Sequence, residues 1–201
     1  MNILHVTTSP MGNASQSIKL GNAIVQKIKE THPNAVVKIT DLNLLPFPHL
    51  TENQISSIYT PVESRTADQK KLLEKSDEAV AELFDADIII VSTPMYNFGI
   101  PSSLKAWIDH IARGGVTFKY SPEGAEGLVK NKKAYLAIST GAVFSEGAYK
   151  EMDFTASYLK AVLGFIGITD VNTFRVEGLA IPGISEHAAT KALQTVSEFN
   201  F

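Results

Sequence analysis

The sequence predicts an α/β fold in which helices cover both faces of one doubly wound parallel β-sheet. Short apolar runs alternate along the chain with longer segments whose apolar residues recur every three or four positions. The run Ile88-Ile89-Ile90-Val91 is continuously apolar, which is typical of a strand that a parallel sheet buries on both faces. With 201 residues, 44% of them hydrophobic and 19% charged, the chain can form one well-packed core. We therefore expect a single domain over residues 1–201.

Five segments are predicted to be strands because their apolar residues are clustered over a short length. They are Asn2–Thr8, Ala35–Asp41, Asp87–Ser92, Lys132–Ser139 and Ile168–Arg175. Strands that alternate with helices are joined by right-handed crossovers and lie parallel in the sheet. Five such strands favour the flavodoxin-like order 2-1-3-4-5, although their spacing alone does not determine that order.

Amphipathic spacing predicts the helices. They are Ser15–Thr31, Glu52–Tyr59, Thr66–Phe84, a segment containing Leu104, Trp107, Ile108 and Ile111, then Tyr149–Phe165, and finally Ser185–Phe201 with Ser185 as its N-cap. Two segments do not fit the alternation. Leu42–Arg65 is long for a loop, and Gly114–Leu128 is expected to form a hairpin-like excursion.

Composition excludes several classes of function. The chain has no cysteine, so disulfides, thiolate-bound metal clusters and a thiol nucleophile are ruled out. Its formal net charge of −3 favours neither nucleic acid nor an anionic membrane surface. No histidine has a partner at metal-ligand spacing, and no signal peptide or membrane-spanning run is present. We expect a cytoplasmic protein with small-molecule substrates.

In a sheet of this order, ligands bind outside the carboxyl ends of the strands, where the strand order reverses. The loops after the first, third and fourth strands are Ser9–Ser17, Thr93–Pro101 and Ser139–Ala148. The first places the hydroxyls of Ser9, Ser15 and Ser17 beside the free N–H groups of a helix N-terminus, with no lysine. This combination suits a terminal phosphomonoester such as that of FMN. A plain capping loop is the alternative.

The second loop, Thr93–Pro101, contains two prolines, and its aromatic residues Tyr96 and Phe98 flank Asn97. We expect Gly99 to provide unusual backbone angles. A flat heterocycle needs apolar faces and a donor at its edge, so Asn97 or its backbone N–H is the natural partner for the N5/O4 edge of an isoalloxazine. A tight turn with packed aromatics is the alternative. The third loop has small residues, which suit either close approach of a ligand or simple chain reversal.

These motifs resemble those of the FMN-dependent NADH:quinone oxidoreductases and azoreductases, a branch of the flavodoxin-like superfamily. The resemblance spans the whole chain. Its matching residues are Ser9 with Ser15-Gln16-Ser17, Pro94-Met95-Tyr96-Asn97-Phe98-x-Ile100-Pro101-x-x-Leu104-Lys105-x-Trp107-Ile108-Asp109, Gly115-Val116-Thr117-Phe118 with Tyr120, and Glu126-Gly127-Leu128.

The resemblance implies bound FMN, with NADH or NADPH as co-substrate and a quinone or azo compound as acceptor. It further implies a homodimer whose pockets include residues of both chains. By the same resemblance, the FMN phosphate would be held by Ser9, Ser15, Gln16 and Ser17. The isoalloxazine would be held by Met95, Tyr96, Asn97 and Phe98, and its pyrimidine side would be reached by Ser139, Thr140, Gly141 and Ala142.

One departure concerns the third loop. Many members of the family have Ser-Arg-Gly-Gly there, followed by a histidine, whereas this chain has Ser139-Thr140-Gly141-Ala142 and then Phe144. Exchanging a cation for an aromatic ring should change the charge and shape near the substrate. Because the flavin supplies the chemistry, no side-chain nucleophile is expected. A flavodoxin-type electron carrier and an FMN-free interaction module are the two alternatives.

Overall fold

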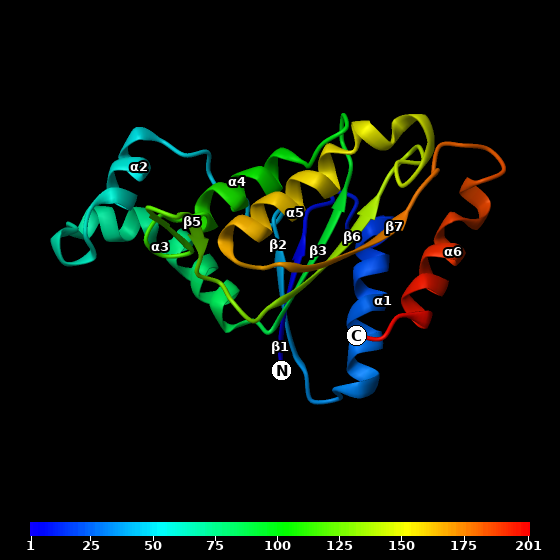
Figure 1. Ribbon diagram of the computed structural model, residues 1–201, viewed down its shortest axis with the longest axis horizontal. Coiled ribbons are helices and arrows are strands. Elements are labelled where there is room, and N and C mark those ends of the chain that lie inside the picture. The colour runs from blue at the N-terminus through cyan, green and yellow to red at the C-terminus, as the bar shows by residue number, and fades with distance from the viewer.

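The computed structural model describes all 201 residues and contains one five-stranded parallel sheet (Figure 1). Its strands lie in the order β2-β1-β3-β6-β7, which is 2-1-3-4-5 along this sheet, so the predicted order is confirmed. The strands are β1 (Asn2–Thr7), β2 (Val36–Asp41), β3 (Ile88–Pro94), β6 (Lys133–Ser139) and β7 (Asp170–Val176).

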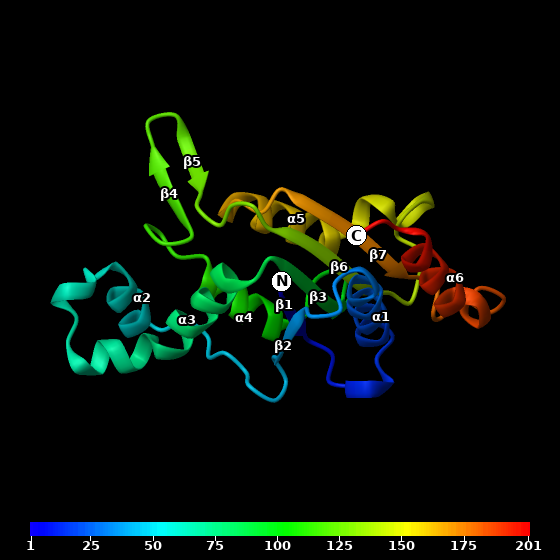
Figure 2. The same cartoon turned by 90° about the horizontal axis from the view of Figure 1, so that it is seen from below.

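Helices cover both faces of the sheet (Figures 1 and 2). One face packs against α1 (Gln16–Thr31) and α6 (Ser185–Glu198), and the other packs against α3 (Ala67–Asp85), α4 (Ser102–Ile111) and α5 (Phe154–Ile166). Strand β3 contributes to both cores, because Ile89 and Val91 lie in one cluster while Ile88 and Ile90 lie in the other. Its continuous apolar run therefore reflects burial on two sides.

Two excursions project from this body (Figure 2). One is the antiparallel hairpin of β4 (Phe118–Ser121) and β5 (Gly124–Gly127), which forms a separate sheet as the sequence predicts. The other follows β2 and contains α2 (Glu52–Tyr59), whose start is fixed by a capping box between Thr51 and Gln54. None of the helices is long and apolar enough to span a bilayer.

The start of α5 and the N-cap of α6 differ from the prediction. Tyr149 lies in a 3₁₀ helix over Gly147–Met152, and α5 begins only after Asp153, whose carboxylate accepts the N–H groups of Thr155 and Ala156 at 3.0 and 2.9 Å. Ser185 is the first helical residue of α6 rather than its N-cap, and Ile184 holds that position without a side-chain hydrogen bond.

Candidate functional site

The three predicted loops meet at the carboxyl edge of the sheet because β1, β3 and β6 are neighbours in register. Thr7 pairs with Ser92, and Pro94 pairs with Ser139. Beyond the strands, Met95 donates its backbone N–H to the Ser139 carbonyl at 2.9 Å, and the hydroxyls of Thr8 and Thr93 are hydrogen-bonded at 2.9 Å. Residues far apart in the sequence thus form one continuous surface.

The first loop combines buried serine hydroxyls with free backbone donors. Ser15 is the N-cap of α1 and accepts the Ile18 N–H, so the capping alternative is also true. Its hydroxyl lies 3.0 Å from that of Ser17, and Ser9, Ser15 and Ser17 are all buried. The backbone N–H groups of Gln16 and Ser17 have no acceptor within the protein. Free donors at a helix N-terminus attract an anion without any cation.

The second loop ends in a strained turn. Tyr96 and Gly99 exchange both backbone hydrogen bonds, at 2.9 and 3.0 Å, and between them Asn97 and Phe98 have φ angles of +49° and +69°. Gly99, where unusual backbone angles were expected, does not have a positive φ, and two residues with side chains take the left-handed conformation instead. Such conformations persist where surrounding structure imposes them, and they cluster at functional sites.

This strain exposes groups that a ring could contact. The N–H groups of Asn97 and Phe98 have no acceptor in the protein, and the side chains of Tyr96 and Phe98 are 44% and 42% exposed. Met95, at the start of the turn, is half-buried. The tight-turn alternative describes the backbone correctly, but its aromatic residues are not packed into the core.

The third loop is narrow and held by its neighbours. Thr140 donates its N–H to the Val176 carbonyl at 2.9 Å and its hydroxyl to the Ala142 carbonyl at 2.7 Å. The N–H groups of Gly141, Ala142 and Val143 have no protein acceptor. Phe144 is buried, with its ring edge-on to Phe98 at 6.3 Å and tilted against Tyr149 at 5.9 Å.

These groups fit the parts of FMN. All three loops present unused backbone donors at one edge of the sheet, and the first adds serine hydroxyls. None of the segments Ser9–Ser17, Thr93–Pro101 and Ser139–Phe144 contains an acidic residue, so no carboxylate within them repels a phosphate or a reduced ring. The observed donor set is the one that a flavin phosphate and a heterocycle with carbonyl edges require.

The buried histidines belong to the core. His5 Nε2 lies 2.8 Å from Ser92 Oγ, and burial lowers the pKa of His5 to about 4. His110 contacts the Pro48 carbonyl at 2.9 Å, and burial lowers its pKa as well. Sequence reasoning missed Phe154, whose N–H anchors the Phe98 carbonyl at 3.1 Å, because no local motif connects residues so far apart.

A family model for the flavodoxin-like fold matches residues 1–199. The chain is 43% identical over 198 residues to the FMN-dependent NADH:quinone oxidoreductase of Herminiimonas arsenicoxydans, covering 98% of this chain and 97% of that protein. It is 45% identical over 197 residues to FMN-dependent NADH:quinone oxidoreductase 1 of Rhizobium etli, covering 98% and 96% of the two chains.

Solved structures give the same result. An azoreductase from Bacillus anthracis str. Sterne superimposes with a TM-score of 0.89 at 30% identity, over 98% of this chain and 97% of that one. An FMN-dependent NADH-azoreductase from Bacillus anthracis str. Ames Ancestor, in complex with FMN, has a TM-score of 0.87 at 25% identity over the same shares. With a sheet of the expected strand order and similarity along its whole length, the chain belongs to the flavodoxin-like family of FMN-dependent NADH:quinone oxidoreductases and azoreductases.

Proposed function

We propose that the protein binds FMN and transfers two electrons from NADH or NADPH to quinones, aromatic azo compounds or both, by a ping-pong mechanism. One observation carries the proposal: three loops of a family member present their unused backbone donors together, beside a strained turn with exposed aromatic rings. Bound FMN would supply hydride acceptance and hydride delivery, as cofactors do for chemistry that side chains cannot perform.

The protein's own groups would bind and orient. Ser9, Ser15 and Ser17, with the N–H groups of Gln16 and Ser17, would hold the phosphate. The N–H groups of Asn97 and Phe98 would hold one edge of the ring, and those of Gly141 to Val143 would lie at the other. Donors aimed in advance at a developing negative charge stabilise it without reorganisation, so they would favour the reduced ring.

The experiment is a stopped-flow measurement on the purified, FMN-loaded protein mixed with NADH and, separately, with NADPH. We expect the flavin absorbance to bleach under anaerobic conditions and to return when a quinone or azo dye is added. Flavin that binds but is not bleached by either nucleotide would indicate the electron-carrier alternative. A protein that binds no FMN would indicate the interaction module.

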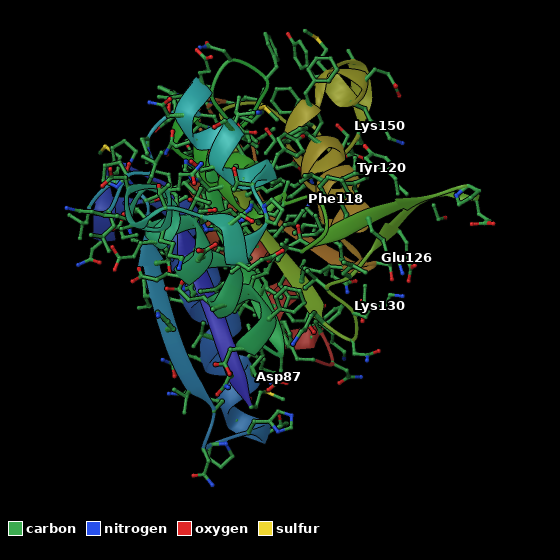
Figure 3. All side chains as sticks on the ribbon, turned by 90° about the vertical axis from the view of Figure 1, so that its left-hand side faces the viewer. Asp87, Phe118, Tyr120, Glu126, Lys130 and Lys150 are labelled. Atoms are coloured by element: carbon green, nitrogen blue, oxygen red, sulfur yellow. The ribbon has the colours of Figure 1, made fainter.

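We also propose a homodimer with two FMN sites at the subunit boundary. A hydride-transfer pocket must exclude water, and the ring loops leave one face open. Tyr120 and Phe118 lie on the hairpin (Figure 3), where Tyr120 is 76% exposed and Phe118 is half-buried. The Phe118 ring packs against Phe165 of α5, whereas Tyr59 at the end of α2 is 80% exposed. Exposed aromatic residues on projecting elements are typical of interfaces.

Analytical ultracentrifugation tests this assembly. We expect a particle of twice the 21.8 kDa chain mass, and dilution to monomer should release flavin and abolish turnover together. A fully active, flavin-loaded monomer would contradict a shared pocket. In that case the chain's own two excursions would have to cover the open face of the flavin ring.

A further inference from the structure

Three largely buried charged side chains form a cluster at the carboxyl end of β7, beside the third loop. The Arg175 guanidinium is ion-paired with Asp153 and lies 3.6 Å from the Glu177 carboxylate. Their side chains are only 17%, 9% and 13% exposed for Arg175, Asp153 and Glu177. One guanidinium nitrogen, Arg175 Nη1, is buried without a hydrogen-bond partner. This Nη1 faces Glu177 Oε1 at 3.6 Å, within ion-pair range but beyond hydrogen-bond distance. Because a buried ion pair adds little net stability, positioning of neighbouring groups is a second reason to keep one.

Glu177 holds the part of the third loop that precedes the 3₁₀ helix. Its Oε1 accepts the backbone N–H of Phe144 at 2.8 Å and that of Ser145 at 2.9 Å. Behind this segment lies a groove of about 670 Å³ between β7 and α6, lined in part by Val143, Ser145 and Glu146. Arg175 and Glu177 line the same groove, so the two hydrogen bonds from the loop to Glu177 hold a segment that borders open space.

Asp153 connects the same cluster to the second loop. One carboxylate oxygen caps the N-terminus of α5, and the other is paired with Arg175. The first residue of α5, Phe154, donates its N–H to the Phe98 carbonyl at 3.1 Å. The cluster is thus connected at one end to Phe144 and at the other to Phe98, and the rings of these two residues contact each other edge-on.

We propose that Asp153, Arg175 and Glu177 are positioning residues that set the spacing of the Phe98 and Phe144 rings and thereby the fit of the aromatic acceptor. The proposal rests on the proposed function. It assigns to the cluster the placement of the two aromatic rings against which the acceptor would bind. No hydrogen bond or ion pair joins the phosphate loop to the three residues, so the affinity for FMN phosphate should not depend on them.

The variant Glu177→Met tests the hydrogen bonds, because it keeps the side-chain length and removes both acceptor oxygens. Glu177→Gln retains a carbonyl acceptor and should restore most of the effect. Glu30→Gln is a matched control, since Glu30 forms an exposed ion pair with Lys27 on α1, away from the cluster. Hydrogen exchange of the FMN-free proteins gives a readout independent of activity. We expect the Phe144 and Ser145 amides of Glu177→Met to exchange roughly tenfold to a hundredfold faster, with the amides of β1 and β3 unchanged.

The second readout is kinetic, with 2-methyl-1,4-naphthoquinone as the acceptor. Loss of an aromatic contact should raise the KM for the quinone by about twofold to tenfold in Glu177→Met. The dissociation constant of FMN and the single-turnover rate of flavin reduction by NADH should stay at the wild-type values. A merely structural role would lower thermal stability but would not move the KM for the acceptor alone.

The outcomes are distinguishable. If wild-type protein neither binds FMN nor oxidises NADH, the proposed function fails, and the positioning role fails with it. If the wild-type protein does both, and Glu177→Met keeps either the wild-type quinone KM or the wild-type exchange of Phe144 and Ser145, only the positioning role is overturned. A KM that rises equally in Glu177→Met and Glu30→Gln would also overturn it.

Discussion

Acid should destabilise this protein through His5, which sits in the middle of β1. The side chain is 1% exposed, its Nε2 contacts Ser92 Oγ, and its Nδ1 has no hydrogen-bond partner. Burial removes water from the ring without supplying an anion, so the charged form is disfavoured and the pKa falls from 6.5 to about 4. The native state therefore contains neutral His5 at pH values where the unfolded chain is protonated.

The sign and size follow from proton binding. Above pH 6.5, the ring is neutral in both states, and its contribution to the free energy of unfolding is fully present. As the pH falls from 6.5 toward 4, the unfolded state binds a proton and the native state does not, so stability is lost. At about 1.36 kcal/mol per pKa unit, the full loss is about 3 kcal/mol.

Urea unfolding at a series of pH values from about 7.5 to 4.5 measures this loss. The comparison is between wild-type protein and His5→Gln, because burial lowers the pKa of His110 too and both proteins share that background. We expect the stability difference between them to shift in favour of the variant as the pH falls. His49→Gln, in an exposed loop, controls for loss of a histidine as such. Parallel profiles for wild-type protein and His5→Gln over the whole range would refute the reasoning.

Three further substitutions test the site and its support. Ser17→Ala should weaken FMN binding by roughly tenfold to a hundredfold without unfolding the protein, because it removes a hydrogen bond to a charged group; equilibrium dialysis measures this, and unchanged affinity would exclude the role. Asn97→Ala should retain FMN but slow its reduction at saturating NADH, while Asn97→Gly keeps the positive φ and isolates the side chain. Gly21→Ala would place a Cβ 2.0 Å from Ser92 Oγ and 2.6 Å from His5 Nε2, so we expect a loss of about 1–3 kcal/mol in urea unfolding, despite the better helix propensity of alanine.

The elements were accessible from the sequence because their signals are local, whereas the strand order was favoured by the α/β alternation and not determined by spacing. The run Ile88–Val91 is continuously apolar, which predicts a strand buried on both faces, and its residues do lie in both cores. Amphipathic spacing likewise predicts a helix from the residues of that segment alone. The loops of the candidate site were accessible once the strand order was expected, because in a doubly wound sheet that order determines which loops lie next to one another.

Other features depend on contacts between segments far apart in the chain. Unusual backbone angles were expected at Gly99 because glycine adopts them easily, and the positive φ angles of this loop occur at Asn97 and Phe98. The two hydrogen bonds between Tyr96 and Gly99 close this turn locally, and the N–H of Phe154, from a distant segment, holds it at the Phe98 carbonyl. A local preference worth about 1–2 kcal/mol yields when several tertiary contacts specify another conformation.

The start of α5 shows the same competition. Tyr149 and its neighbours have helical character, and they do form a 3₁₀ turn, but α5 begins at the carboxylate of Asp153. That side chain is held by Arg175, 22 residues later, which itself lies beside Glu177.

The sequence by itself determined the sheet, its covering helices and the loops that meet at its edge, because these follow from the pattern of apolar residues along short stretches. Only the tertiary structure decided how those loops are held, because paired charges and shared hydrogen bonds form between residues that the chain brings together after it folds.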